Sequence, residues 1–165
     1  MSDFSAAEIS ELKELLEKEK IRKLKQLYSH LMDSKQIDAL ADIFTEDAVC
    51  EFGPEYGSWE GRETIRTNYH GVFDEQPQFN AMHHITNHYV DLTGPDTATG
   101  RSYLIDVITA TEPDGQPIVW FGLYDEDYQK IDDKWYIKRC TLQFLWPQKM
   151  TTDSFEIPYP DVSSA

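Results

Sequence analysis

Two consecutive segments decide the fold: MHHITNH at residues 82–88 and TATGRSYLID at residues 97–106. From Met82 onward the hydrophobic period is two, which is typical of β-strands with one buried face. Gly94, Pro95 and Asp96 lie between the segments, and these residue types favour a turn. We therefore predict two adjacent antiparallel strands joined by a short turn.

This hairpin predicts a pairing between His83 and Asp106. In an antiparallel ladder, the numbers of any two paired residues have the same sum. If the turn is centred on residues 94 and 95, this sum is about 189, which pairs residue 83 with residue 106. Asp106 lies among apolar neighbours such as Leu104 and Ile105, where an isolated carboxylate is costly. An imidazole across a strand gap of ~5 Å can be its hydrogen-bonded partner, and it titrates near neutral pH.

The period of two continues toward the C-terminus, with turn residues between the apolar runs. The predicted strands cover residues 83–92, 97–111, 117–130 and 134–146. Their turns lie at residues 94–96, 113–115 and 132–134. Long neighbouring strands with short turns predict an antiparallel meander.

Helical periodicity dominates the chain before these strands. Ser5 and Glu8 form a capping-box pattern, which predicts a helix over residues 5–32, either continuous or broken near Lys20. Further along, the pattern predicts a short helix over 35–41, an extended segment over 44–52, and a helix opening at 59–63 and ended by 76–78. Helices followed by strands define an α+β class, and helices packed on a curved sheet would enclose an apolar pocket suited to a small ligand.

The chain length fits one domain spanning residues 1–165. Its core is expected over about 15–146, with a helical extension at 1–14 and an irregular tail at 147–165.

The charge balance excludes several classes of partner. The 30 acidic residues outnumber the 15 basic ones, giving a net charge of −15. Such a surface repels nucleic acid and anionic membranes. No apolar run approaches the ~20 residues of a membrane span, and no signal-peptide pattern opens the sequence. Two isolated cysteines, Cys50 and Cys140, give no disulfide framework. We expect a cytoplasmic protein.

The histidines do not predict a metal site. On one strand His84 and His88 would share a face but lie about 13 Å apart at ~3.3 Å per residue, with His83 on the opposite face. Zinc–nitrogen bonds are only ~2.1 Å long. The sequence also has no glycine-rich phosphate loop and no nucleophile elbow. We expect neither a metal nor a cofactor.

Two residues near the end of the first helix have open roles. Tyr28 shares a helix face with Leu24 and Leu31, so its ring is predicted to face the core, either as a packed aromatic or as a catalytic group. Asp33 falls at the helix C-terminus, where a negative charge is unfavourable. Capping the following helix would explain it without any chemistry.

These patterns resemble the nuclear-transport-factor-2-like superfamily in its SnoaL-like branch, over residues 15–146. The resemblance rests on the helix phrase 21–40, the strand start at 82–83, and the segments 97–106 and 128–137. Within the branch the chain resembles the bile-acid 7α-dehydratases most, and scytalone dehydratase and hexachlorocyclohexane dehydrochlorinase more distantly. The resemblance implies a cone-shaped α+β barrel with the active site inside the cone, commonly assembled as a trimer.

The resemblance also implies roles for individual residues. Four of them match the catalytic positions of the bile-acid enzymes: Tyr28, Asp33, His83 and Asp106. His83 would take the proton beside a carbonyl, while Tyr28 would assist the leaving hydroxyl or polarise the carbonyl. Both aspartates would orient and tune the imidazole. We expect four further residues to contact substrate: Met32, His84, Leu104 and Phe121. His84 is also the alternative base.

The function that these residues favour is that of a cofactor-independent, dehydratase-like lyase acting on a cyclic, largely apolar hydroxy-ketone. Two alternatives stay open: an isomerase or polyketide cyclase of the same fold, and a non-catalytic binding module or partner subunit. Apolar residues on both faces of segments 101–108 and 118–124 predict a homo-oligomer. A trimer is favoured over a dimer.

Overall fold

The computed structural model describes residues 4–53, 56–75, 80–109 and 118–146. Three helices and six strands are assigned in these ranges: α1 (Ala6–Asp33), α2 (Ile37–Ala41), β1 (Phe44–Glu51), β2 (Ser58–Glu60), α3 (Arg62–Glu75), β3 (Asn80–Leu92), β4 (Thr97–Thr109), β5 (Ile118–Ile131) and β6 (Lys134–Trp146). The predicted α+β class is confirmed.

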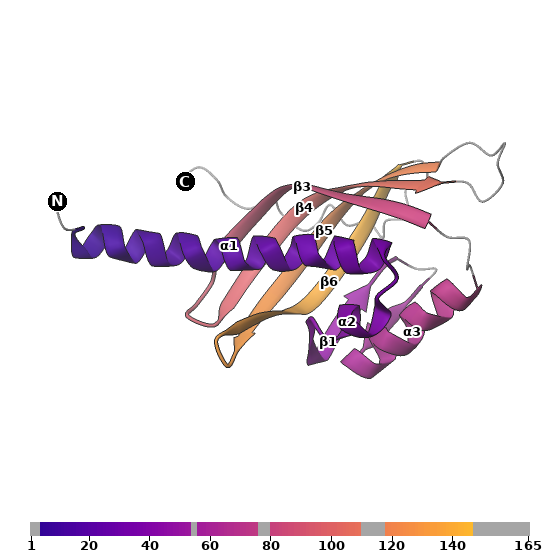
Figure 1. Ribbon diagram of the computed structural model, residues 1–165, viewed down its shortest axis with the longest axis horizontal. Coiled ribbons are helices and arrows are strands. Elements are labelled where there is room, and N and C mark those ends of the chain that lie inside the picture. The colour runs from indigo at the N-terminus through magenta and orange to yellow at the C-terminus, as the bar shows by residue number, and fades with distance from the viewer. Residues whose placement is uncertain (1–3, 54–55, 76–79, 110–117, 147–165) are drawn as a thin grey trace.

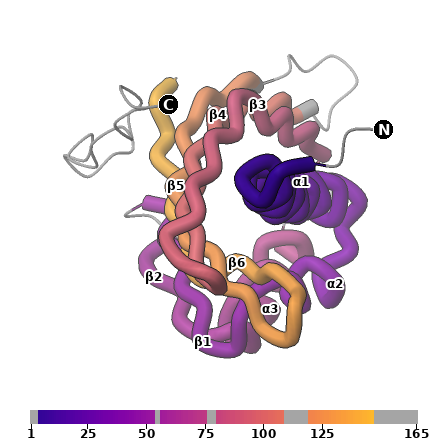
Figure 2. Tube along the Cα trace, turned by 90° about the vertical axis from the view of Figure 1, so that its left-hand side faces the viewer, coloured from indigo at the N-terminus to yellow at the C-terminus, as the bar shows by residue number. Residues whose placement is uncertain are grey.

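All six strands form one sheet in the order β2-β1-β6-β5-β4-β3. Strands β3 to β6 are the predicted antiparallel meander. The sequence did not predict that β1 pairs with β6 in parallel, nor that β2 pairs antiparallel to β1. The sheet is strongly curved but open, since β2 and β3 are its edges. Figure 2, viewed along α1, shows the sheet curving around this helix.

Helix α1 is continuous for 28 residues, so no break occurs near Lys20. Its predicted capping box is present: Ser5 accepts from the Glu8 backbone N–H at 3.2 Å, and the Ser5 backbone N–H donates to the Glu8 carboxylate at 2.8 Å. The first half extends beyond the sheet (Figure 1) with Leu15 and Leu16 exposed, whereas burial begins at Ile21. None of the helices in the described ranges is both long and apolar enough to cross a bilayer.

The segment around Trp59 was predicted to open a helix, but it forms the short strand β2. Helix α3 begins only at Arg62, directly after Gly61. The φ of Gly61 is +88°, a value that favours glycine, and its N–H donates to the Ala48 carbonyl at 2.8 Å. A tight turn therefore separates β2 from α3, which packs against β1 and β2.

The pairing of β3 with β4 places His83 directly opposite Asp106, as the hairpin predicted. A bulge then shifts the register between Thr86 and Tyr89, and Asn87 has a positive φ of 51° there. The extra residue reverses the alternation of side chains. His88 consequently faces the concave side with His83, and the prediction that it shares a face with His84 is wrong.

The predictions for the turn at 113–115, the helix end at 76–78 and the tail at 147–165 lie outside the described residues.

Candidate active site

The concave side of the sheet, α1 and α3 line a partly open cavity of about 140 Å³. An apolar cavity of about 150 Å³ is known to hold one benzene molecule, so this space suits a ligand with one six-membered ring. Most of the wall is aromatic or aliphatic. Its members include Met32, Phe52, Trp59, Phe73, Leu104, Trp120, Leu142 and Phe144. The wall also contains an imidazole, a carboxyl and several phenols.

Most of the predicted site residues come together at this cavity. Tyr28, His83 and Asp106 line it, as do the predicted substrate contacts Met32 and Leu104. Asp33 is not part of the wall but contacts His83 from behind.

The structure does not bring the other two predicted substrate contacts into the cavity. His84 is exposed, because strand alternation turns it away from the side that His83 faces. Phe121 is 41% exposed and packs beside Trp146, with ring centroids 5.7 Å apart. Neither side chain lines the cavity, so both assignments are corrected.

Asp33 holds His83 in a fixed orientation. Its Oδ1 lies 2.6 Å from Nδ1 of the imidazole, and its two carboxylate oxygens accept from the His83 backbone N–H at 3.2 and 3.1 Å. An ionised carboxylate can only accept, so beside the Asp33 carboxylate Nδ1 is the nitrogen that donates. In the neutral ring, Nε2 then keeps its lone pair and can act as a base toward the cavity.

The alternative prediction, that Asp33 caps the next helix, is wrong. Helix α2 starts at Ile37 and has no hydrogen bond from a capping side chain. Ser34 instead closes the end of α1, where its hydroxyl donates to the His30 carbonyl at 2.6 Å. Lys35 then adopts a positive φ of 57° as the chain reverses.

Asp106 faces the free side of the imidazole without contacting it. Oδ2 lies 3.9 Å from Nε2 of His83, beyond hydrogen-bond distance. Oδ1 has no hydrogen-bond partner in the described part of the chain, although the residue is only 6% exposed. Burial raises the pKa of this carboxyl; His83 opposes that change, and Asp33 adds to it. The strand pairing was thus predicted correctly, but the predicted direct hydrogen bond is not formed.

Tyr28 is buried, as its helix face predicted. Its hydroxyl lies 3.1 Å from that of Tyr69, and its ring packs edge-on against Tyr124. Burial raises the pKa of the Tyr28 phenol well above its usual value, and the nearby Tyr69 adds to this rise. The phenol therefore stays protonated at neutral pH and can donate a hydrogen bond.

A buried ionic network supports these tyrosines from behind. The Lys25 ammonium lies 2.8 Å from the Glu126 carboxylate and 3.4 Å from the centroid of the Tyr124 ring. Tyr128 donates to Glu126 at 2.7 Å and lies 3.2 Å from Nε2 of His88. Sequence reasoning missed this network, although a lysine on the apolar face of the first helix was a readable signal.

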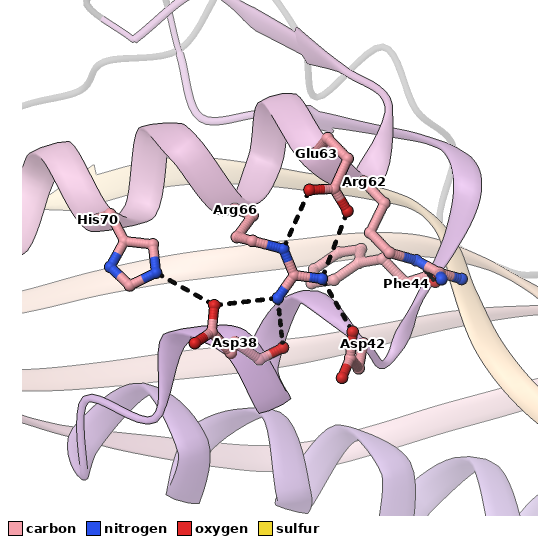
Figure 3. A network of polar contacts seen from close by, with 7 residues as sticks. All are labelled: Asp38, Asp42, Phe44, Arg62, Glu63, Arg66 and His70. Atoms are coloured by element: carbon pink, nitrogen blue, oxygen red, sulfur yellow. Dashed lines mark hydrogen bonds and ion pairs between the residues drawn. The ribbon is translucent and has the colours of Figure 1, made fainter.

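A second polar network lies on the surface and ties α3 to α2 (Figure 3). The Arg66 guanidinium contacts Asp38 at 3.1 Å, Asp42 at 2.9 Å and Glu63 at 3.3 Å, and these carboxylates raise its pKa. His70 also reaches Asp38, at 3.2 Å. Exposed ion pairs of this kind contribute little individually. The network connects two elements of the fold and does not line the cavity.

The groups around the cavity are ones that move protons: an oriented imidazole, a buried carboxyl and a protonated phenol. Among the described residues, no group of three or more histidine, cysteine or acidic side chains is arranged to bind a metal ion.

Helices packed in a strongly curved, mostly antiparallel sheet around such a cavity define the class of NTF2-like proteins with a cystatin-like fold. The family model for the SnoaL-like domain matches residues 13–141, and the chain belongs to this family.

Solved structures share the fold. A presumed scytalone dehydratase from Novosphingobium aromaticivorans DSM 12444 has 24% identity and a TM-score of 0.72, covering 84% of this chain and 90% of its own. LinA has 21% identity and a TM-score of 0.73, with coverages of 83% and 91%. A presumed aromatic ring hydroxylase from Novosphingobium aromaticivorans has 31% identity and a TM-score of 0.67, with coverages of 81% and 92%. No curated protein matches the chain by sequence.

Proposed function

We propose that this protein is a cofactor-independent, dehydratase-like lyase that eliminates water, or a similar group, from a cyclic and largely apolar hydroxy-ketone. One observation carries the proposal. Asp33 fixes His83 from behind, so that Nε2 lies 3.9 Å from Oδ2 of the buried Asp106 at an aromatic cavity, and Oδ1 of Asp106 has no hydrogen-bond partner among the described residues.

The proposed chemistry is a proton transfer coupled to loss of a hydroxyl group. Nε2 of His83 takes a proton from the carbon beside the carbonyl. The released electron pair forms a carbon–carbon double bond while the bond to the β-hydroxyl breaks. Asp106, whose raised pKa favours the protonated acid, gives its proton to the departing hydroxyl, which leaves as water. Acid–base assistance of this kind typically contributes ~10²–10⁴-fold.

Asp33 and Tyr28 have supporting roles in this scheme. The Asp33 carboxylate stabilises the imidazolium that forms when His83 accepts the proton. The Tyr28 phenol donates a hydrogen bond either to the carbonyl or to the leaving hydroxyl. The Asp33 carboxylate disfavours a negatively charged ligand, and the apolar wall favours an uncharged ring.

The comparisons agree with this proposal at a coarse level, since a presumed scytalone dehydratase shares the fold. A presumed aromatic ring hydroxylase shares the fold as well, so the fold by itself does not decide between the lyase and its alternatives, which include a binding module or partner subunit. An isomerase or cyclase would use the same base without a leaving group. The resemblance to the bile-acid 7α-dehydratases remains a prediction, based on the sequence segments quoted above.

Cyclic β-hydroxy-ketones test the proposal, with 3-hydroxycyclohexanone as the single-ring member that matches the cavity. We expect the purified protein to convert at least one of them to its conjugated enone, measured by ultraviolet absorbance, and His83→Ala to abolish this. Exchange of α-hydrogen for deuterium without loss of water would instead indicate an isomerase or cyclase. Neither reaction, across single-ring and fused-ring substrates, would overturn the lyase and favour a binding module.

We also infer that the protein is a homo-oligomer, with a trimer favoured. Large apolar side chains remain exposed on the sheet in this single chain: Met82, Tyr103, Phe121 and Trp146. Exposed apolar patches of this kind are typical of protein interfaces.

A further inference from the structure

Two polar atoms in the cavity wall have no hydrogen-bond partner in the described residues: Oδ1 of Asp106 and Nε1 of Trp120. Both atoms are buried, and both side chains line the same cavity. The two residues are directly paired across β4 and β5. Buried polar groups are nearly always hydrogen-bonded in native proteins, so two unsatisfied atoms on paired residues of one cavity wall point to a ligand that satisfies them.

The indole of Trp120 is held in place rather than free to find a partner. Its ring packs edge-on against Phe144, with centroids 4.8 Å apart. Other tryptophans have satisfied N–H groups: Trp59 donates to the Tyr56 carbonyl at 2.9 Å, and Trp135 donates to Glu17 at 2.7 Å. The unsatisfied N–H of Trp120 is thus a local property of the cavity.

We propose that Trp120 is a specificity-determining residue whose indole N–H donates a hydrogen bond to the carbonyl oxygen of the bound ligand. The indole is a donor only, so it selects an acceptor oxygen and not a hydroxyl acting as a donor. The identification of this acceptor as the ketone rests on the proposed function. When His83 removes the neighbouring proton, negative charge develops on that same oxygen, and a fixed donor stabilises it.

In this assignment, the two oxygen atoms of the ligand contact different members of the Asp106–Trp120 pair. Trp120 would bind the carbonyl oxygen, while Asp106 would face the hydroxyl that leaves. The ligand class is therefore an uncharged ring carrying an acceptor oxygen on the β4–β5 side of the cavity.

Nuclear magnetic resonance of the ¹⁵N-labelled indole groups tests the contact directly. The probes are cyclohexanone and methylenecyclohexane, which have nearly the same shape but differ in the acceptor oxygen. We expect cyclohexanone, and not methylenecyclohexane, to shift the Trp120 N–H resonance downfield. Trp146 is 53% exposed and does not line the cavity, so its resonance is the internal control. A Trp120 resonance that responds equally to both probes would overturn the proposal.

Affinity measurements with Trp120→Phe give a second, independent outcome. Phenylalanine keeps an aromatic ring beside Phe144 but removes the N–H. We expect about a tenfold loss of affinity for cyclohexanone, the size of one ordinary hydrogen bond, and little change for methylenecyclohexane. Trp146→Phe is the matched control. Equal losses for both probes would show that Trp120 only shapes the cavity.

These measurements separate this inference from the proposed function, because cyclohexanone has no hydroxyl to lose. A binding protein without lyase activity would still show the selective shift. Conversely, enone formation by a Trp120→Phe variant with unchanged ketone affinity would support the lyase and reject this role for Trp120.

Discussion

Nδ1 of His83 lies 2.6 Å from Oδ1 of Asp33, although 50 positions separate the two residues in the chain. The same carboxylate also accepts from the His83 backbone N–H. The end of α1 is thereby fixed to the start of β3, and the orientation of the proposed base depends on that contact. A histidine oriented by a carboxylate presents its second nitrogen in a defined direction.

This relationship predicts that Asp33→Asn reduces turnover strongly while the protein stays folded. The amide can keep one contact to the His83 backbone but does not carry the charge that stabilises the imidazolium. We expect a loss of about 10²-fold for Asp33→Asn and ~10²–10⁴-fold for His83→Ala, measured as enone formation. His84→Ala is the control, because its side chain is exposed outside the cavity. A large loss in the His84 variant, with His83→Ala active, would reverse the assignment of the base.

Asp106→Asn is expected to lose activity and gain stability. Burial raises the pKa of the Asp106 carboxyl in the folded state, so the unfolded state releases this proton at lower pH than the folded state. The aspartate therefore costs stability progressively as pH rises above the ordinary value near 3.8. Removing such a group commonly raises the free energy of unfolding by about 1 kcal/mol, which corresponds to an increase of about 2–4 °C in Tm.

Thermal unfolding at pH 4 and pH 7 measures this effect, and the gain should be larger at pH 7. A variant with a lower Tm at both pH values would show instead that Asp106 stabilises the fold.

The burial of His88 leads us to predict that the protein loses stability in acid. Burial lowers the pKa of His88 to about 4 in the folded state; Glu126 opposes this change, and Lys25 and Arg22 add to it. Between pH 6.5 and 4 the unfolded chain therefore binds a proton that the folded protein excludes. Stability should fall by up to about 3 kcal/mol as pH decreases through this window.

Denaturant unfolding between pH 7 and pH 4 tests this, with His88→Gln and His84→Gln compared. The His88 variant should show a flatter decline than wild type, and the exposed His84 variant should follow wild type. Parallel curves for both variants would assign the acid sensitivity to other groups.

The exposed apolar face predicts self-association. Phe121 and Trp146 are 41% and 53% exposed, with ring centroids 5.7 Å apart. We expect sedimentation to give a multiple of the 19.2 kDa chain mass, and Phe121→Glu to shift it toward the monomer. Leu16→Glu, at an exposed leucine on the projecting half of α1, is the comparison. Dissociation by the Leu16 variant alone would move the interface to that helix, and a stable wild-type monomer would refute association.

The sequence by itself determined the β3–β4 hairpin and which of its residues pair across the two strands. The turn residues 94–96 set the register between β3 and β4, and the predicted pairing of His83 with Asp106 is the one observed. The α+β class and the burial of Tyr28 were predictable for the same reason. Periodicity and turn chemistry act between neighbours in the chain, so they can be read without knowing the fold.

Only the tertiary structure decided how these residues are used. The bulge at Asn87 reverses the face of His88, the parallel pairing of β1 with β6 adds to the sheet the two strands that α3 packs against, and α1 brings Asp33 to His83. Each depends on contacts between distant segments, whose geometry follows from packing the whole core. The same packing leaves Asp106 3.9 Å from the imidazole and turns Trp120 into the cavity. A difference of about 1 Å separates a hydrogen bond from a gap that a ligand atom can occupy, and no sequence pattern specifies distances on that scale.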